Sequence, residues 1–390
     1  MSVLLHDGRR AGHLSWLRES LAAGLADGAV LNAFFTPQVA VPRNPSAADI
    51  IAELRGQAPA GQSPEILFDS ATWAATLPGT DLWATYGSWP LWPRRVRSDL
   101  SDAGAVADHV RAVFDIQRSL GVPLLAPTVT ADTAAGTQAR LALDIAAEAK
   151  RQEPDCLLTI CGINTFWRAG PALDRYVGQL ARLRPAGWYV IPLRDRAGYP
   201  ADMTDSNATA GWLRTIHSLA LRNRVIAAHT DHLGVAAAVA GASTVGTGWD
   251  QAQRACSGDA FRDGGGGTNV NYSPHPGLLA RFTETVARGL RDLQPAFAEA
   301  MRWGEPIPTD MRAHRVQHFQ ALREQFDTIC NAGPTPSARA AFLRNVFTGA
   351  DIAWDYAIGL GAADITAVEK ATWFDGLRAG FELYALAEGI

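Results

Sequence analysis

The sequence predicts an α/β fold, specifically a (β/α)8 TIM-type barrel followed by a C-terminal helical extension. From about residue 29, short apolar runs alternate with longer segments of helical period, a pattern typical of parallel strands joined by crossover helices. The strand runs are nearly continuous in apolar residues, as expected when both faces of a sheet are covered. An open doubly wound sheet needs a glycine-rich phosphate turn after its first strand, and this chain has FFTPQVAVPRNP there. The barrel is therefore the expected fold.

Seven strands are predicted from these runs, one fewer than a closed eight-stranded barrel contains. They cover residues 30–35, 65–68, 123–129, 156–161, 188–193, 224–229 and 243–247. We expect the eighth strand in DLWATYGSW, residues 81–89, in preference to the N-terminal SVLLH. Asp205 or Ser206 before a helical segment is a typical helix start. Beyond residue 306 only helical periods remain, so the predicted division is a barrel over 1–305 and a helical region over 306–390.

Composition excludes several classes of protein. Of the 390 residues, 47% are hydrophobic and 19% charged, and the net charge of -4 provides no global basic field for a nucleic acid. The four cysteines lack C-x-x-C spacing, so we expect neither a disulfide framework nor a cysteine zinc site, and a reduced cytoplasmic protein is the default. No apolar run has the length of a membrane span or of a signal peptide, so no membrane partner is expected. The oligomeric state stays open.

Polar residues that directly follow the predicted strands are the candidate site, because the carboxyl ends of barrel strands meet at one mouth. Asp69 ends the apolar run EILF, where a carboxylate is costly to desolvate unless something pairs or uses it. We leave open whether it caps the next segment or functions. The candidate catalytic residues are Asp69, Asp231 and Asp250. The candidate substrate-binding residues are Ser70, Thr72, Asn164, Arg194, His229, His232 and Trp249.

The segment AAHTDHLG suggests a second chemistry. It places His229, Asp231 and His232 at the end of a predicted strand, where imidazole and carboxylate groups could serve a metal-dependent hydrolase. Barrel hydrolases of that kind also carry an H-x-H pair on the first strand, which here ends in FFTPQ. We therefore predict no metal site and no cofactor. Asp231 could equally cap the helix that follows it.

Two further segments are candidates for ligand contact. Arg94, Arg95 and Arg97 in LWPRRVRSD lie beside two tryptophans, and arginine with tryptophan suits stacking on bases and contact with phosphates. A solvated loop with half-buried tryptophans explains the same residues. The glycine-rich stretch after the last predicted strand, around residues 248–277, is long for a compact domain, and we expect a flexible lid there.

Several strand ends resemble those of the tRNA-guanine transglycosylases and the related 7-deazaguanine DNA-modification transglycosylases. ILFDSATW is similar to their ILTDSGGF-like segment, and LTICGINTFWRAG, GWYVIPLRDR and RVIAAHTDHLG follow in the family's order, so the resemblance covers about residues 30–256. It implies a barrel in which Asp69 faces the exchanged base. This sequence has Gly246 where the family has its nucleophilic aspartate, and Asp250 is the nearest carboxylate, four residues on. The family's zinc-binding C-x-C-x-x-C is absent.

Three functional hypotheses follow. The first is a divergent transglycosylase-like protein that recognises a purine-like base, nucleoside or nucleic acid, in which Asp250 or Asp231 acts as nucleophile for base exchange if that chemistry is retained. The second is the barrel hydrolase built on His229, Asp231 and His232. The third is a non-catalytic binding or scaffold protein with the same barrel.

Overall fold

A computed structural model gives the fold of the chain. The structure describes residues 1–8, 12–42, 44–57, 63–77, 84–93, 96–194, 201–258, 271–300, 307–361 and 365–390. Of the sequence predictions, Arg94, Arg95 and the middle of the expected lid, 259–270, lie outside these described residues.

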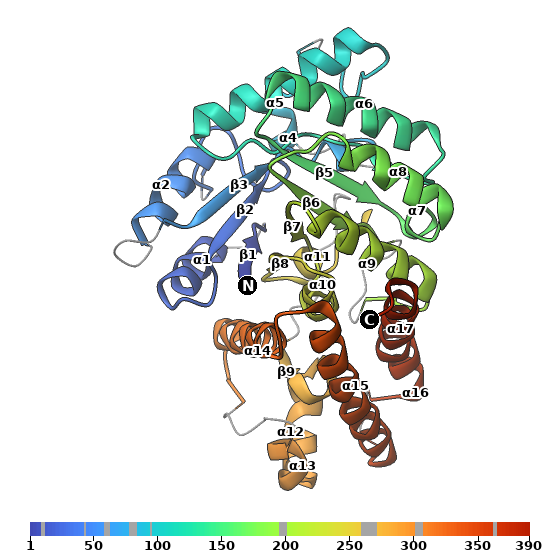
Figure 1. The fold of residues 1–390 in the computed structure, drawn as a ribbon. Helices are drawn as coiled ribbons and strands as arrows, with labels where there is room; N and C mark the ends of the chain where they lie inside the picture. The colour runs from blue at the N-terminus through green and yellow to red at the C-terminus, as the bar shows by residue number, and fades with distance from the viewer. Residues whose placement is uncertain are drawn as a thin grey trace.

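Eight parallel strands form one curled sheet, with helices between consecutive strands (Figure 1). The order of the strands in the sheet is β3-β2-β1-β8-β7-β6-β5-β4, so the first strand lies beside the last. Their bounds are β1 Ser2–His6, β2 Gly28–Asn32, β3 Glu65–Asp69, β4 Thr130–Ala131, β5 Leu157–Gly162, β6 Gly187–Pro192, β7 Arg224–Ala227 and β8 Thr244–Gly248. Every residue of β2, β5, β6 and β8 is buried, as expected for a parallel sheet that is covered on both faces.

The helices cover the outer, convex face of the sheet (Figure 1). Those between the strands are α1 His13–Ala22, α2 Ala47–Gln57, α3 Thr72–Ala75, α4 Ala84–Gly87, α5 Ala103–Leu120, α6 Thr137–Gln152, α7 Asn164–Trp167, α8 Pro171–Ala181, α9 Ser206–Ala220, η2 Asp231–Leu233 and α10 Gly234–Val239. The predicted helix start before residue 206 is confirmed, because the Asp205 side chain accepts from the backbone N-H of Ala208 at 2.9 Å. Asp102 caps α5 in the same way, and Gly121 ends that helix with φ of 64°.

An ion pair across the inside of the sheet fixes which side chains face the concave side. Arg224 on β7 donates both Nη groups to the carboxylate of Glu65 on β3, although three strands separate β7 from β3 in the sheet order. Glu65 therefore points into the concave interior. Because side chains alternate along a strand, Asp69 at the other end of β3 points to that interior as well.

A side chain joins the edge strand β3 to Leu125, which precedes the other edge strand β4. Gln117 of α5 donates to the carbonyl of Phe68 at 2.9 Å and to the carbonyl of Leu125 at 2.8 Å, and its own carbonyl accepts from Leu125 N at 3.0 Å. The described residues contain no backbone ladder between β3 and β4. The buried Gln117 carboxamide thus supplies, across this gap, hydrogen bonds of the kind that backbone groups supply elsewhere in the sheet.

The eighth strand is where the sequence analysis did not expect it. It is the N-terminal Ser2–His6, paired with β2 and β8, whereas the described part of 81–89 contains the short helix α4. The predicted run 123–129 makes only an isolated bridge from Leu125 to Leu157, and the regular strand β4 follows it. The other six predicted strands are confirmed to within a few residues.

After β8 and the short helix α11, Gln251–Arg254, the chain leaves the sheet. An antiparallel hairpin, β9 Tyr272–His275 and β10 Ala280–Thr283, encloses η4 Pro276–Leu278. The helices that follow are α12 Glu284–Leu293, α13 Pro295–Ala300, α14 Met311–Asn331, α15 Pro336–Gly359, α16 Ala367–Glu369, the π-helix η5 Lys370–Asp375 and α17 Gly376–Glu388.

The predicted C-terminal helices are thus present, and they gather on one side of the sheet (Figure 1). In that arrangement α14 and α15 contact α10, and α17 packs along α9. None of the helices in the described ranges combines the length and apolar character needed to cross a bilayer.

Candidate functional site

Asp69 is a buried carboxylate held in one orientation at the carboxyl end of β3. It is 4% exposed, and its Oδ1 accepts from Ala71 N at 2.7 Å while its Oδ2 accepts from the Trp73 indole at 3.0 Å. Burial raises the pKa of Asp69 from 3.8 to about 6, and these two hydrogen bonds offset only part of the rise. A carboxylate offers about four lone-pair sites, so the group retains acceptor capacity beyond its two local bonds.

Aromatic and thiol side chains surround Asp69 on the concave face. Tyr189 on β6 and Cys161 on β5 are fully buried, and burial together with the nearby charge of Asp69 raises the pKa of both groups. Tyr86 stacks on Phe34 with ring centroids 4.0 Å apart. The guanidinium of Arg97 lies 4.5 Å from the centre of the Tyr86 ring, so this predicted nucleic-acid contact is a cation-π partner at the same end of the sheet.

His6 and His229 form a stacked pair beside this group. Their ring centroids are 3.7 Å apart at 16°, and His6 Nε2 accepts from the backbone N-H of His229 at 3.2 Å. His229 Nδ1 lies 3.0 Å from the carbonyl of Gln253, so Nδ1 is the donor and Nε2 carries the lone pair. Burial lowers the pKa of His229 to about 4, which keeps the ring neutral near pH 7. His229 also has φ of 54°, a strained conformation for a non-glycine residue.

The His6 ring occupies the space beside Gly246. A Cβ atom placed on Gly246 would lie 2.3 Å from His6 Nε2 and 3.1 Å from the Ala228 Cα. Position 246 is where the transglycosylase resemblance puts the nucleophilic aspartate. In this chain an imidazole from β1 fills the corresponding volume.

Asn164 and Arg194 meet at the ends of β5 and β6. Arg194 Nη1 lies 3.4 Å from Asn164 Oδ1, and its backbone N-H donates to the carbonyl of Cys256 at 2.7 Å. Ser70 and Thr72 point elsewhere. Their hydroxyls lie 3.1 Å apart, and Thr72 bonds His109 of α5 at 3.0 Å, on the convex side of β3.

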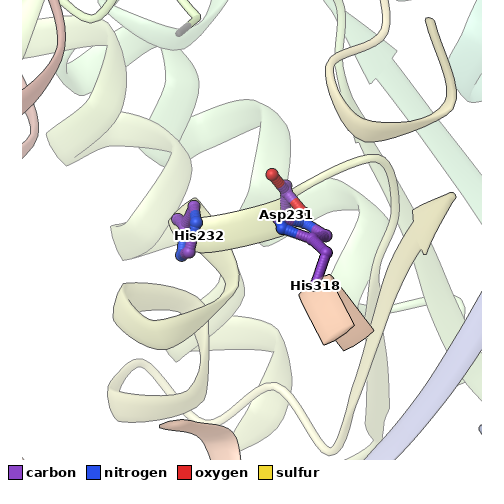
Figure 2. Close-up of side chains that lie close together, drawn as sticks. All are labelled: Asp231, His232 and His318. Atoms are coloured by element: carbon purple, nitrogen blue, oxygen red, sulfur yellow. Dashed lines mark hydrogen bonds and ion pairs between the residues drawn. The ribbon is translucent and has the colours of Figure 1, made fainter. Parts of the chain in front are cut away.

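Asp231 and His232 lie close to His318 of α14 (Figure 2). Asp231 Oδ1 accepts from Thr247 at 3.0 Å and from His318 Nε2 at 2.8 Å, and His232 Nδ1 lies 3.1 Å from Gln325 Oε1. On β8 the alternation puts Thr247 on the face opposite Thr244, which binds Arg224 in the interior. The cluster of Asp231, His232 and His318 therefore lies on the convex side, between β8 and α14.

Burial and electrostatics leave this cluster with a carboxylate and neutral imidazoles. The hydrogen bond from His318 and the charge of Arg254 hold the pKa of Asp231 well below its usual range despite its burial. Burial lowers the pKa of His318 well below 6.5, and the Arg254 charge lowers it further. We therefore describe the contact between His318 and Asp231 as a neutral imidazole donating to a carboxylate. Ligand atoms of the three residues all lie within 4.8 Å of one another, so they could hold a metal ion.

Trp249 and Asp250 also belong to the outer layer. Trp249 makes an edge-to-face contact of 4.8 Å with Trp16 of α1. The Asp250 carbonyl accepts from the backbone of Gln253 and Arg254 at the start of α11, and Arg315 of α14 lies 3.8 Å from its carboxylate.

The predicted site residues therefore fall into separate groups. At the concave end of the sheet Asp69 and Arg97 both lie near Tyr86, and the stack of His6 and His229 lies beside Tyr189, whereas Asp231 and Asp250 each contact α14. Sequence reasoning missed His6 because its strand was expected elsewhere. It also missed His318, although two histidines four residues apart in AHRVQHFQ mark one face of a helix.

No protein-family model matches the chain, and no curated protein matches it significantly. The fold and the candidate site alone therefore define the class of protein. The chain is an α/β protein with an eight-stranded parallel curled sheet, C-terminal helices and a buried carboxylate at the carboxyl ends of the strands.

Proposed function

We propose that the protein recognises a purine-like base, free or within a nucleoside or nucleic acid, at the concave carboxyl end of a closed barrel. The observation that carries this proposal is Asp69, a buried carboxylate that two local donors hold in a fixed orientation. A planar heterocycle presents ring N-H and amino groups that such a carboxylate can accept. Fixed acceptors lose little entropy on binding, which favours specific recognition.

The aromatic surroundings support the same ligand class. Tyr86 and Tyr189 lie close enough to Asp69 for its charge to raise the pKa of both, Arg97 lies over the Tyr86 ring, and ring faces and guanidinium planes stack on bases. The neutral His229 adds an acceptor nitrogen from the other side of the sheet. The resemblance to base-exchanging transglycosylases points to this ligand class as well.

Base exchange needs a second functional group at the same site. It requires a carboxylate nucleophile in addition to a group that contacts the base. Asp231 and Asp250 are engaged with residues of α14, and His6 fills the space beside Gly246. We therefore place recognition first and treat exchange as a separate activity to be assayed.

A ligand screen by thermal unfolding tests recognition. Guanine, 7-deazaguanine bases and guanosine should raise the melting temperature of the wild-type protein, because a ligand that binds only the folded state stabilises it by about 2.7 kcal/mol at 100 times its Kd. Asp69→Asn should lose most of that shift. Asp310→Asn, at a helix cap of α14 that likewise accepts a backbone N-H, is the matched control and should keep it.

Incorporation of labelled guanine into tRNA and duplex DNA tests exchange. Incorporation that disappears in Asp69→Asn would extend the proposal to catalysis. Binding of a base without incorporation of labelled guanine would indicate a protein that recognises the base and does not exchange it. If no base shifts the melting temperature and no label is incorporated, the proposed function is wrong.

A further inference from the structure

We propose that Asp231, His232 and His318 form a divalent transition-metal site that fastens α14 to the carboxyl ends of β7 and β8. The three side chains come from η2 and α14, and one ligand atom of each lies within 4.8 Å of the others (Figure 2). The site lies on the convex side of the sheet. It is therefore separate from Asp69 and does not rest on the proposed function.

Unpaired polar atoms are the main reason for this proposal. Asp231 Oδ2, His232 Nε2 and His318 Nδ1 have no hydrogen-bond partner within the described parts of the chain. The three residues are 3%, 0% and 1% exposed, so bulk water does not supply the missing bonds. Buried polar groups in proteins are nearly always paired, and an ion is one of the few explanations for three unpaired atoms in one place.

The groups behind the ligands have the arrangement of a metal site. His232 donates from Nδ1 to Gln325, which leaves the lone pair on Nε2 free to bind an ion. Thr247 donates to Asp231 and fixes the orientation of the carboxylate. Metal-bound histidines and carboxylates are usually oriented by such outer hydrogen bonds.

The donor set narrows the choice of ion. Two imidazole nitrogens and one carboxylate oxygen suit Zn²⁺ first, and Fe²⁺, Mn²⁺ or Co²⁺ in the same geometry. Ligand atoms about 2.0–2.1 Å from a tetrahedral ion are about 3.3 Å apart. Asp231 Oδ1 and His318 Nε2, 2.8 Å apart, are closer than that and are bonded to each other, so the unpaired Oδ2 of Asp231 and Nδ1 of His318 are the atoms left for the ion.

Arg254 is the competing explanation. Its guanidinium acts electrostatically on all three residues, and its charge balances that of Asp231 without any ion. Its Nε donates to the carbonyl of Gly248 at 2.7 Å. In that alternative the three unpaired atoms stay unpaired, and the protein neither binds nor responds to a metal.

An entry route exists next to Gln325. This residue also lines a cavity of about 200 Å³ between α10, α14 and α15, together with Val235, Ile329 and Leu343. Rotation of the Gln325 side chain would open the cluster to that cavity.

Metal content and stability test the site. Protein purified without chelator and supplied with Zn²⁺ should contain one transition-metal ion per chain by elemental analysis. Removal of the ion with a chelator should lower the melting temperature by several degrees, and Zn²⁺ should restore it. Less than about a tenth of an ion per chain, or a melting temperature that neither chelator nor Zn²⁺ changes, would contradict the proposal and favour the Arg254 alternative.

Variants locate the ion. His318→Ala and Asp231→Asn should reduce the metal content to near zero, whereas His314→Ala, buried one turn earlier on α14 and bonded instead to Ser273 and Glu284, should keep it. Should the ligand variants not fold, the visible spectrum of Co²⁺-loaded wild-type protein still reports nitrogen and oxygen ligands around the ion. A spectrum like that of hydrated Co²⁺ in solution would contradict the proposed metal site. Base-induced melting shifts should be the same with and without the ion, so the outcome is independent of the proposed function.

Discussion

At the scale of single residues, the capping contacts of Asp69 are compatible with the binding role that we propose for it. Its two oxygens accept from Ala71 and Trp73, which is the capping role that the sequence left open. The same side chain points into the concave interior and is buried almost completely. Because burial disfavours the charged form, this carboxylate reduces the stability of the fold at neutral pH, as is common where binding groups are desolvated.

The pH dependence of stability measures that cost. The folded pKa of Asp69, about 6, lies above its ordinary value of 3.8, so the folded state holds more protons than the unfolded state between pH 4 and 6. Stability contributed by this group therefore falls as the pH rises through that window. Relative to Asp69→Asn, the wild-type free energy of unfolding should decrease by about 2–3 kcal/mol between pH 4 and 7. Urea unfolding at several pH values checks this, and parallel profiles for the two proteins would contradict it.

At the scale of elements, close approach between helices depends on glycines that the sequence alone does not distinguish. Gly380 on α17 faces α9, and a Cβ there would lie 2.6 Å from the Thr209 Cβ. Gly349, inside α15, has nothing within 4 Å of the same position. The first glycine permits the packing of α17 along α9, whereas the second only weakens its own helix.

Alanine at the two positions should therefore act in opposite directions. Gly380→Ala should lower the free energy of unfolding by about 1–3 kcal/mol, since the added methyl separates the two helices. Gly349→Ala should raise it by about 0.5–1 kcal/mol through better helix propensity. Chemical denaturation of both variants gives the comparison. Equal effects would show that the α9–α17 contact is not the constraint we describe.

The sequence predicted elements with a strong hydrophobic period correctly. It gave little information where the apolar runs are short. Six of the predicted strands and the C-terminal helices agree with the structure because their apolar pattern follows from burial on both faces or on one stripe. The five residues SVLLH have no preceding turn signal, and DLWATYGSW is equally apolar. A short apolar run does not reveal its partner strand, so the eighth strand was placed wrongly.

At the scale of the whole molecule, the contact between β3 and the segment that precedes β4 depends on Gln117. Its carboxamide bonds the backbone of Phe68 on β3 and of Leu125, five residues before β4, and no ladder joins β3 to β4 in the described residues. A single side chain on α5 thereby links the two edges of the sheet. This contact is part of the closed barrel that we propose.

Gln117→Leu should weaken this join severely. The variant loses three buried hydrogen bonds and leaves backbone groups of Phe68 and Leu125 unpaired, at a cost of about 2–5 kcal/mol in the free energy of unfolding. Gln152→Leu, a half-buried glutamine on α6 that donates to Ala107, should cost about 1 kcal/mol or less. Thermal and urea unfolding measure both. A loss at Gln117 no larger than at Gln152 would mean that the edges are held by something else.

The sequence by itself determined six of the eight strands of the sheet and the presence of polar groups at the strand ends, because burial and helical period are local properties of the chain. Only the tertiary structure decided which of those groups meet. The curl of the sheet turns Asp69 and His229 inward, and the positive φ values of 54° at His229 and 45° at Asp231 redirect the chain after β7. Asp231 consequently faces His318, 87 residues further along. No local pattern encodes that meeting, because it depends on where α14 packs against the sheet.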